Sequence, residues 1–213
     1  LGIRTINWIF ALKLIKNSTA LSKEKLTTFL NSIYLQTNYL SNNLSKFSSA
    51  NNHLTGELAG LKLISAILPS LPKAREWHEL SSTMLDQVLL DQTFEDGVGK
   101  EQSSNYLIFI LDLYFVSSLS TINKTKIKEN IKQRLAQSGD FLLHLYSKGM
   151  PSLGDSDEAN LIGLYNERER IESIFCNLYQ INNNHNFNFS SEKSFWIDQQ
   201  VTNNNNNNNS SES

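Results

Sequence analysis

The sequence predicts an all-α protein built from antiparallel helix hairpins, and three observations support this fold class. Apolar residues recur at intervals of three and four along most of the chain, as with Ile6, Ile9 and Phe10 near its start. This spacing is typical of a helix with one buried face. The 213 residues include only 9 Gly and 3 Pro, so few positions interrupt a helix. No segment before residue 185 shows the alternation of apolar and polar residues that is typical of a strand.

The periodicity predicts six or seven helices with short connections, which favour antiparallel packing of neighbours. The helices are expected near residues 6–14, 22–39, 54–68, 72–89, 104–114, 124–146 and 158–179. Ser22 is a suitable N-cap for the second helix, and Ser103 or Ser104 for the fifth. Pro69 ends the third helix, and Pro72 is expected in the first turn of the fourth, where its missing N–H costs no hydrogen bond.

A change in composition near residue 181 divides the chain into two parts. Residues 1–180 carry the helical pattern, and the chain as a whole is 39% hydrophobic, which is enough for a packed core. Residues 181–213 are rich in Asn and Ser, 203–209 are all Asn, and no apolar residue follows Val201. Because such a segment buries too little apolar surface to offset the entropy of ordering it, we expect a disordered tail.

Charge and composition exclude several classes of partner and cofactor. The net charge is −2, and without a basic stripe no nucleic-acid partner is expected. No apolar run approaches the roughly 20 residues of a membrane span, so no membrane partner is expected either. The single cysteine, Cys176, excludes an intrachain disulfide and a Cys-based zinc site. The chain has no phosphate-binding loop, no Gly-rich dinucleotide turn and no His-Glu-x-x-His motif, so we expect no cofactor and no metal.

The first cluster with chemical potential is the Asn-rich start of the third helix. His53 and Glu57 are four residues apart and therefore share one face of this helix. Asn52 lies at the helix N-terminus, where backbone N–H groups favour bound anions. The alternative interpretation of the same residues is an Asn cap followed by a surface His–Glu pair.

A second cluster occupies residues 96–106, a Gly-containing turn that leads into the fifth helix. Tyr106 shares a helix face with Phe109 and Ile110, so it is either a core tyrosine or a functional one. Glu101 and Gln102 precede the helix directly and are either caps or site residues.

The third cluster is the acidic loop 154–157. Asp155 and Asp157 either cap the helix that follows or coordinate a cation. Calcium prefers more oxygen ligands than this loop supplies, which favours capping.

The order and spacing of four motifs resemble the helical domain of the heparinase II/III-like polysaccharide lyases. In this chain the motifs read RTINW at residues 4–8, NHLTGE at 52–57, DGVGKEQSSNY at 96–106 and GDSD at 154–157. The resemblance covers about residues 1–180. One departure is Leu107, because the family tyrosine is commonly followed by His.

The resemblance implies a fold and a reaction. The fold is an (α/α) toroid of antiparallel helix hairpins, incomplete in this chain, and a C-terminal β domain follows it in full-length members. The substrate is an acidic polysaccharide that contains uronic acid, similar to heparin, heparan sulfate or alginate. The reaction is β-elimination, in which a base removes the C5 proton and the 4-O glycosidic bond breaks. The implied location is the periplasm or the outside of the cell.

The resemblance also implies roles for individual residues. Asn52 neutralises the substrate carboxylate, Tyr106 acts as general acid or base, and His53 binds the carboxylate or steers Tyr106. In this scheme Glu57 fixes the tautomer of His53. A second base, a histidine, comes from the β domain in family members. The residues assigned to substrate binding are Glu57, Glu101, Gln102, Asp155 and Asp157.

Two alternative functions remain open at this point. The first is a toroid that binds glycans without catalysis, which would fit Leu107 and the missing β domain. The second is a glycoside hydrolase on a similar toroid, which would need two carboxylates in the cleft as acid and base. For the lyase we expect Asn52, His53, Glu101 and Tyr106 to converge on one concave face, because elimination needs the carboxylate binder and the acid within reach of one sugar.

Overall fold

The computed structural model describes residues 1–118, 127–147, 153–156, 161, 174 and 175. The helices in these ranges are α1 (Gly2–Ile15), α2 (Lys23–Asn42), the short 3-10 helix η1 (Phe47–Ser49), α3 (Asn52–Ile67), α4 (Ala74–Gln92), α5 (Ser104–Ser118) and α6 (Glu129–Tyr146). The described ranges contain no strand, only an isolated bridge between Thr93 and Gly99. The predicted all-α fold class is therefore confirmed.

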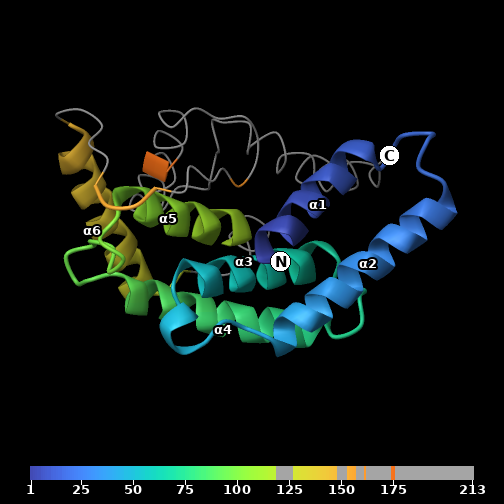
Figure 1. Cartoon of the computed structure of the whole chain (residues 1–213), viewed down its shortest axis with the longest axis horizontal. Helices are drawn as coiled ribbons and strands as arrows, with labels where there is room; N and C mark the ends of the chain where they lie inside the picture. Colours follow the sequence, from blue (N-terminus) through green and yellow to red (C-terminus); the bar gives the residue numbers. More distant parts are fainter. Residues whose placement is uncertain (119–126, 148–152, 157–160, 162–173, 176–213) are drawn as a thin grey trace, which may run out of the picture.

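Helix α3 lies at the centre of the arrangement (Figure 1). It contacts α1, α2, α4 and α5, while α6 packs against α4. Its sequence explains this place, because most residues of α3 are apolar or small, and a helix with apolar residues on every side is stable only when buried. Helix α5 has the same character, and each residue from Leu107 to Ser118 is buried. The more amphipathic α2 and α6 lie at opposite ends of the molecule in Figure 1.

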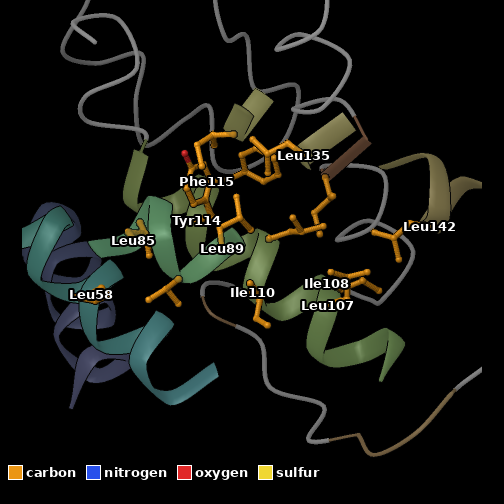
Figure 2. Close-up of a cluster of buried hydrophobic side chains, with 14 of the residues drawn as sticks. Leu58, Leu85, Leu89, Leu107, Ile108, Ile110, Tyr114, Phe115, Leu135 and Leu142 are labelled. Atoms are coloured by element: carbon orange, nitrogen blue, oxygen red, sulfur yellow. The ribbon is translucent and has the colours of Figure 1, made fainter. Parts of the chain in front are cut away.

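The largest hydrophobic cluster joins α3, α4, α5 and α6 (Figure 2). Helix α4 contributes Leu85, Val88 and Leu89, which lie on one stripe at helical spacing. Leu135 and Leu142 of α6 cover the other side of the cluster. Burying one such side chain contributes on the order of 1.5–3 kcal/mol. This cluster therefore holds α4, which ends at Gln92, against α3, α5 and α6.

Helices α1 and α3 cross so closely that their backbones touch. A Cβ atom on Gly60 would lie 2.9 Å from both the Cα and the carbonyl oxygen of Gly2. A Cβ on Gly2 would in turn overlap the carbonyl group of Gly56. The glycine within the NHLTGE motif therefore belongs to a helix crossing that only small residues allow.

Most of the predicted helix boundaries agree with the structure to within a few residues. Ser22 Oγ accepts a hydrogen bond from the N–H of Lys25 at 3.3 Å, which confirms the predicted cap. The prediction for Pro72 is wrong, because α4 begins at Ala74. Lys73 stands between them with a left-handed φ of 65°, and a residue in that conformation cannot continue a helix.

Several other expectations concern the ends of helices or the end of the chain. Helix α1 begins at Gly2, before the first periodic residue, and α6 begins at Glu129 rather than near residue 124. The seventh helix, apart from residues 174 and 175, and the whole tail lie outside the described residues. In the part of the chain that the structure describes, no helix has the length and hydropathy to cross a membrane.

Candidate functional site

The N-terminus of α3 is joined directly to the turn that precedes α5. The backbone N–H of Asn52 donates to Glu101 Oε1 at 2.9 Å, and Asn52 Nδ2 donates to Glu101 Oε2 at 2.8 Å. Both hydrogen bonds are partly buried, and they link residues 49 positions apart in the sequence. Asn51 Oδ1 caps the same helix by accepting from the N–H of His53 at 3.2 Å. Two of the expected site residues, Asn52 and Glu101, are thus in contact.

Gln92, the last residue of α4, is a buried polar group that the sequence analysis missed. Its Nε2 donates to the carbonyl oxygens of Asn51 and Ala50, at 2.5 and 3.3 Å, and its Oε1 accepts from Thr55 Oγ1 at 2.9 Å. The residue is 6% exposed. A signal was present, because Gln92 continues the apolar stripe of Leu85 and Leu89, and a polar residue in a buried stripe needs polar partners.

The turn between α4 and α5 is held from both sides. The N–H of Lys100 donates to the carbonyl oxygen of Gln92 at 2.8 Å. Gly97 has a φ of 88° and packs on the backbone of α6, where Ser138 Oγ donates to its carbonyl oxygen at 2.9 Å. Gln102 is exposed and has a left-handed φ of 54°, which is uncommon for a residue other than glycine. This conformation lets the chain turn sharply between Glu101 and α5.

Tyr106 lies in the first turn of α5, five residues after Glu101. Its backbone N–H donates to Ser103 Oγ at 3.1 Å, which confirms Ser103 as a cap of this helix. Tyr106 is half-buried, whereas Phe109 and Ile110 on the same face are buried. Helix geometry therefore leaves Tyr106 at the margin of the core rather than inside it.

The acidic loop packs against the start of α5. Ser103 Oγ donates to the carbonyl oxygen of Asp155 at 2.6 Å, and the N–H of Ser104 donates to the carbonyl oxygen of Leu153 at 3.0 Å. Gly154 has a φ of 72°, and a Cβ there would overlap the carbonyl oxygen of Gln102. The Asp155 side chain is exposed and accepts from the N–H of the next residue at 3.0 Å. Asp157 lies outside the described residues.

The structure does not show the expected contact between the side chains of His53 and Glu57. The two carboxylate oxygens of Glu57 accept from the backbone N–H and the hydroxyl of Ser45, at 2.7 and 2.8 Å. His53 is exposed, and its backbone N–H bonds to Asn51. Glu57 therefore anchors the segment before α3 instead of fixing the tautomer of His53. The spacing of four placed both residues on one helix, but it could not reveal the competing hydroxyl.

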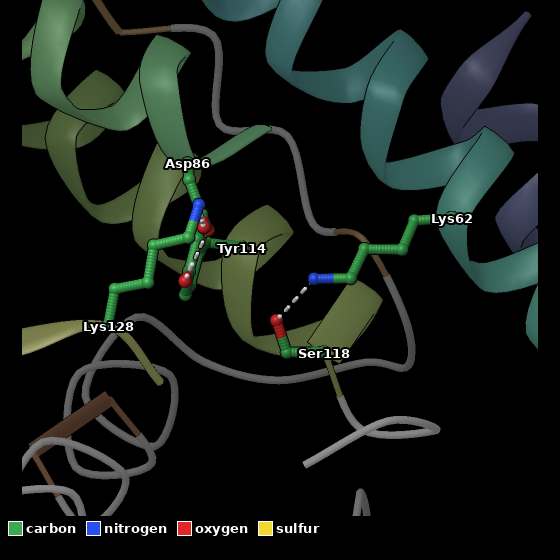
Figure 3. Close-up of polar contacts among 5 residues, drawn as sticks. All are labelled: Lys62, Asp86, Tyr114, Ser118 and Lys128. Atoms are coloured by element: carbon green, nitrogen blue, oxygen red, sulfur yellow. Dashed lines mark hydrogen bonds and ion pairs between the residues drawn. The ribbon is translucent and has the colours of Figure 1, made fainter. Parts of the chain in front are cut away.

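A second set of polar contacts joins α3, α4, α5 and the residue before α6 (Figure 3). Lys62 of α3 is 7% exposed, and its Nζ donates to Ser118 Oγ at 3.3 Å. The Tyr114 hydroxyl donates to Asp86 Oδ1 at 3.1 Å, and Lys128 Nζ lies 2.9 Å from Asp86 Oδ2. Burial lowers the pKa of Lys62, and the charge of Asp86 opposes that shift. Burial is the main cause that raises the pKa of Tyr114, and the charge and hydrogen bond of Asp86 raise it further.

The described residues bring together parts of three of the four sequence motifs. The start of α3, the turn before α5 and the loop at 153–156 meet at one end of α3 and α5. Among all the residues that the structure describes, no three His, Cys, Asp or Glu side chains are grouped so that they could hold a metal ion. The arrangement places an amide, a carboxylate and a tyrosine in neighbouring segments at the N-terminal ends of α3 and α5.

Comparison with known proteins identifies the fold and the family of this chain. The fold is that of an (α/α) toroid domain: it resembles a crystal structure of heparinase III with a TM-score of 0.61 and 20% identity, over 68% of this chain and 23% of that one. A sequence model described as Heparinase II/III N-terminus matches residues 1–182. The chain belongs to the heparinase II/III family, and the matched part is the family's N-terminal region.

One curated protein is also similar in sequence to this chain. The chain is 23% identical to a heparin-sulfate lyase of Bacteroides thetaiotaomicron over 159 residues, which is 73% of this chain and 22% of that protein. The chain thus spans less than a quarter of the length of the proteins that it matches.

Proposed function

We propose that the full-length protein cleaves acidic polysaccharides containing uronic acid by β-elimination. The family and the heparin-sulfate lyase relative support the reaction class. The observation that carries the proposal for this chain is the pair of hydrogen bonds by which Glu101 fixes Asn52 at the N-terminus of α3. The substrate would be a glycan similar to heparin, heparan sulfate or alginate, met in the periplasm or outside the cell.

Asn52 would supply the electrostatic part of the reaction. Removing the C5 proton builds negative charge next to a carboxylate that is already charged, so the enzyme must hold that carboxylate with hydrogen-bond donors. An amide nitrogen carries two N–H groups, and Glu101 accepts from Asn52 Nδ2 through one of them. The other N–H, together with the positive end of the α3 dipole, is suited to the substrate carboxylate. His53, which is exposed on the same turn, would assist in binding it.

Tyr106 would handle the proton of the leaving group. A phenol is a hydrogen-bond donor at neutral pH, so it can protonate the 4-O oxygen as the glycosidic bond breaks. Its place in the first turn of α5, two residues after Ser104 and next to the acidic loop, supports this role. We propose that the second base comes from a C-terminal β domain of the full-length protein.

The deciding experiment measures unsaturated uronate absorbance with the full-length protein. Heparin, heparan sulfate and alginate are the test glycans, and a neutral glucan is the control substrate. The absorbance should rise with at least one uronate polymer and not with the glucan. Reducing ends without absorbance would show a glycoside hydrolase, and binding without products would show a glycan-binding toroid; either result would overturn the proposal.

The variant Tyr106→Phe tests the residue assignment. It keeps the ring and the packing of α5 but removes the hydroxyl. Because general acid catalysis is typically worth a factor of roughly 10² to 10⁴, turnover should fall by that factor while the substrate still binds. The matched control is Tyr39→Phe on α2, where the tyrosine is 59% exposed, and it should retain full turnover. Near-normal activity of Tyr106→Phe would rule out the catalytic role of its hydroxyl.

A further inference from the structure

We propose that Gln92 is a positioning residue for Asn52, acting together with Glu101. The inference rests on the proposed function, in which Asn52 holds the substrate carboxylate. Gln92 belongs to none of the four motifs and lies at the end of a different helix, α4. Its role follows from hydrogen bonds to Asn51 and Lys100, the residues directly before Asn52 and Glu101.

The side chain of Gln92 fixes the first turn of α3. Its amide nitrogen donates to the carbonyl oxygens of Ala50 and Asn51, the two residues directly before Asn52, and its oxygen accepts from Thr55 Oγ1. These contacts bracket Asn52 in the sequence. They therefore set the position and direction of the backbone from which the Asn52 side chain projects.

The backbone of Gln92 fixes the other member of the pair. Its carbonyl oxygen accepts from the N–H of Lys100 at 2.8 Å, which is the residue before Glu101. Gln92 is thus bonded both to the start of the helix that carries Asn52 and to the turn that carries Glu101. A shift of Gln92 would displace both, and the geometry of the Asn52 amide depends on their relative position.

Only a carboxamide satisfies the site that Gln92 occupies. The site demands a donor toward two carbonyl groups and an acceptor toward a hydroxyl, and glutamine has both on one planar group. The residue is 6% exposed, so water cannot readily replace a lost partner, and an unpaired buried polar group is costly. A carboxylate would place negative charge against two carbonyl oxygens, and a thioether would supply neither a strong donor nor a strong acceptor.

Glu101 acts from the opposite side of Asn52. The sequence assigned Glu101 to substrate binding, but in the structure its two oxygens accept from the backbone and the side chain of Asn52. Since the two N–H bonds of an amide nitrogen point in different directions, the bond to Glu101 turns the second N–H away from this carboxylate. Glu101 therefore orients the donor that the substrate would meet, and it is a second positioning residue.

The test compares kcat and KM of full-length Gln92→Met with those of Gln87→Met. Methionine keeps the length of the side chain and removes its polar groups. Gln87 is the matched control, because it lies on the same helix but is exposed and bonds only to Asp91 in the described structure, at 2.9 Å. Small displacements of a reacting group can cost up to about 100-fold, so we expect Gln92→Met to lose between about tenfold and about 100-fold in kcat/KM, with KM raised. Gln87→Met should match the wild type.

A double-mutant cycle separates positioning from general stability. If Gln92 acts through Asn52, then Gln92→Met should cost little more in a protein that already carries Asn52→Ala. Losses that multiply, or a Gln92→Met enzyme with wild-type kcat/KM, would overturn the proposal. Gln92→Glu serves if the methionine variant fails to fold. A protonated carboxyl can donate to one carbonyl group, so its kcat/KM relative to the wild type should recover as the pH falls from about 8 to about 5.

Hydrogen exchange distinguishes failure of this inference from failure of the proposed function. A wild-type protein that forms no unsaturated uronate refutes the lyase proposal, whatever the role of Gln92. Independently of turnover, Gln92→Met should speed amide exchange in residues 52–55, and Gln87→Met should not. Unchanged exchange there would show that Gln92 does not hold the start of α3.

Discussion

Asn52 is held at the N-terminus of α3 through both its backbone N–H and its side-chain amide. Replacing it by alanine in the full-length protein keeps the backbone hydrogen bond to Glu101 and removes the amide donor. Because that donor would contact the substrate carboxylate before and during the reaction, we expect KM to rise and kcat to fall together. This differs from Tyr106→Phe, which should lower kcat while binding persists.

Steady-state kinetics of the Asn52→Ala variant on the preferred uronate polymer check this prediction. The control is Asn31→Ala, since Asn31 is exposed on α2. A loss confined to kcat, with KM unchanged, would show that Asn52 acts only in the transition state, contrary to the role proposed for it.

Lys62 places a titratable amine between α3 and α5, next to Ser118 and the ring of Tyr114 (Figure 3). Burial lowers its pKa from the ordinary value of 10.5. Between the lowered pKa and 10.5 the unfolded chain binds more protons than the folded one, so the contribution of Lys62 to stability rises with pH in that window. Below the window the charged, buried amine has its full unfavourable effect.

The variant Lys62→Met should remove this pH dependence. The thermal midpoint of Lys62→Met minus that of the wild type should be highest near neutral pH and should fall as the pH rises toward 10.5. Lys46→Met, which changes an exposed lysine, provides the baseline. A difference that stays constant with pH, as in the control, would mean that burial does not perturb Lys62.

At the scale of elements, the effect of a glycine substitution on the crossing of α1 and α3 depends on which glycine is changed. A Cβ at Gly60 would meet the backbone of Gly2 at 2.9 Å, whereas a Cβ at Gly56 has its nearest neighbours at 3.8 Å in the side chains of Ile3 and Leu113. The two positions are one helical turn apart, so helix propensity affects them alike and only the space around them differs.

The variants Gly60→Ala and Gly56→Ala should therefore change stability in opposite directions. Gly60→Ala should destabilise the protein by about 1–3 kcal/mol, because the α1 backbone must move. Gly56→Ala should stabilise it by about 0.5–1 kcal/mol, because alanine loses less backbone entropy in a helix. Urea denaturation monitored by circular dichroism gives both values. Equal effects of the two substitutions would contradict the close crossing.

Helix α6 illustrates how an element is docked by a few polar contacts in addition to its apolar face. Arg134 Nη1 donates to the carbonyl oxygens of Leu90 and Thr93, at 3.1 and 2.7 Å, and to Thr93 Oγ1 at 3.0 Å. A cation at the C-terminus of α4 also complements the helix dipole. The same end of α4 carries Gln92, so the docking of α6 supports the region on which the candidate site is built.

At the scale of the whole molecule, this chain corresponds to a small part of the proteins that it matches. The chain covers 22% of the curated lyase and 23% of the heparinase III chain that it resembles. Its helices surround α3, with the candidate site at the end where the second, third and fourth motifs meet (Figure 1).

The asparagine run at 203–209 should be dispensable in the full-length protein. Its residues have no apolar surface to bury, so deleting them should leave the thermal midpoint within about 1 °C of the wild type. Leu85→Ala is the positive control, because Leu85 is fully buried and such a change costs about 2–5 kcal/mol. A clear loss of stability on deletion would show that the run packs against the folded protein.

The sequence was sufficient to predict six helices that the structure describes, the cap at Ser22, a cap at Ser103 or Ser104, and the order of the four motifs. Each of these depends on residues within a few positions of one another, so local periodicity and turn chemistry are sufficient to predict them. The starts of α1, α4 and α6 differ from the prediction. For α4 the reason is the left-handed conformation of Lys73, which has no signature in that residue type.

Which polar groups form hydrogen bonds with one another depends on tertiary packing. Asn52 finds Glu101 across 49 residues, Gln92 finds Asn51 across 41, and Glu57 bonds Ser45 instead of His53. A polar side chain can bond to any complementary group that packing brings within about 3 Å, and the spacing along one helix does not reveal that group. Tertiary packing makes these choices, because an unpaired buried polar group is costly and most such groups therefore find a partner.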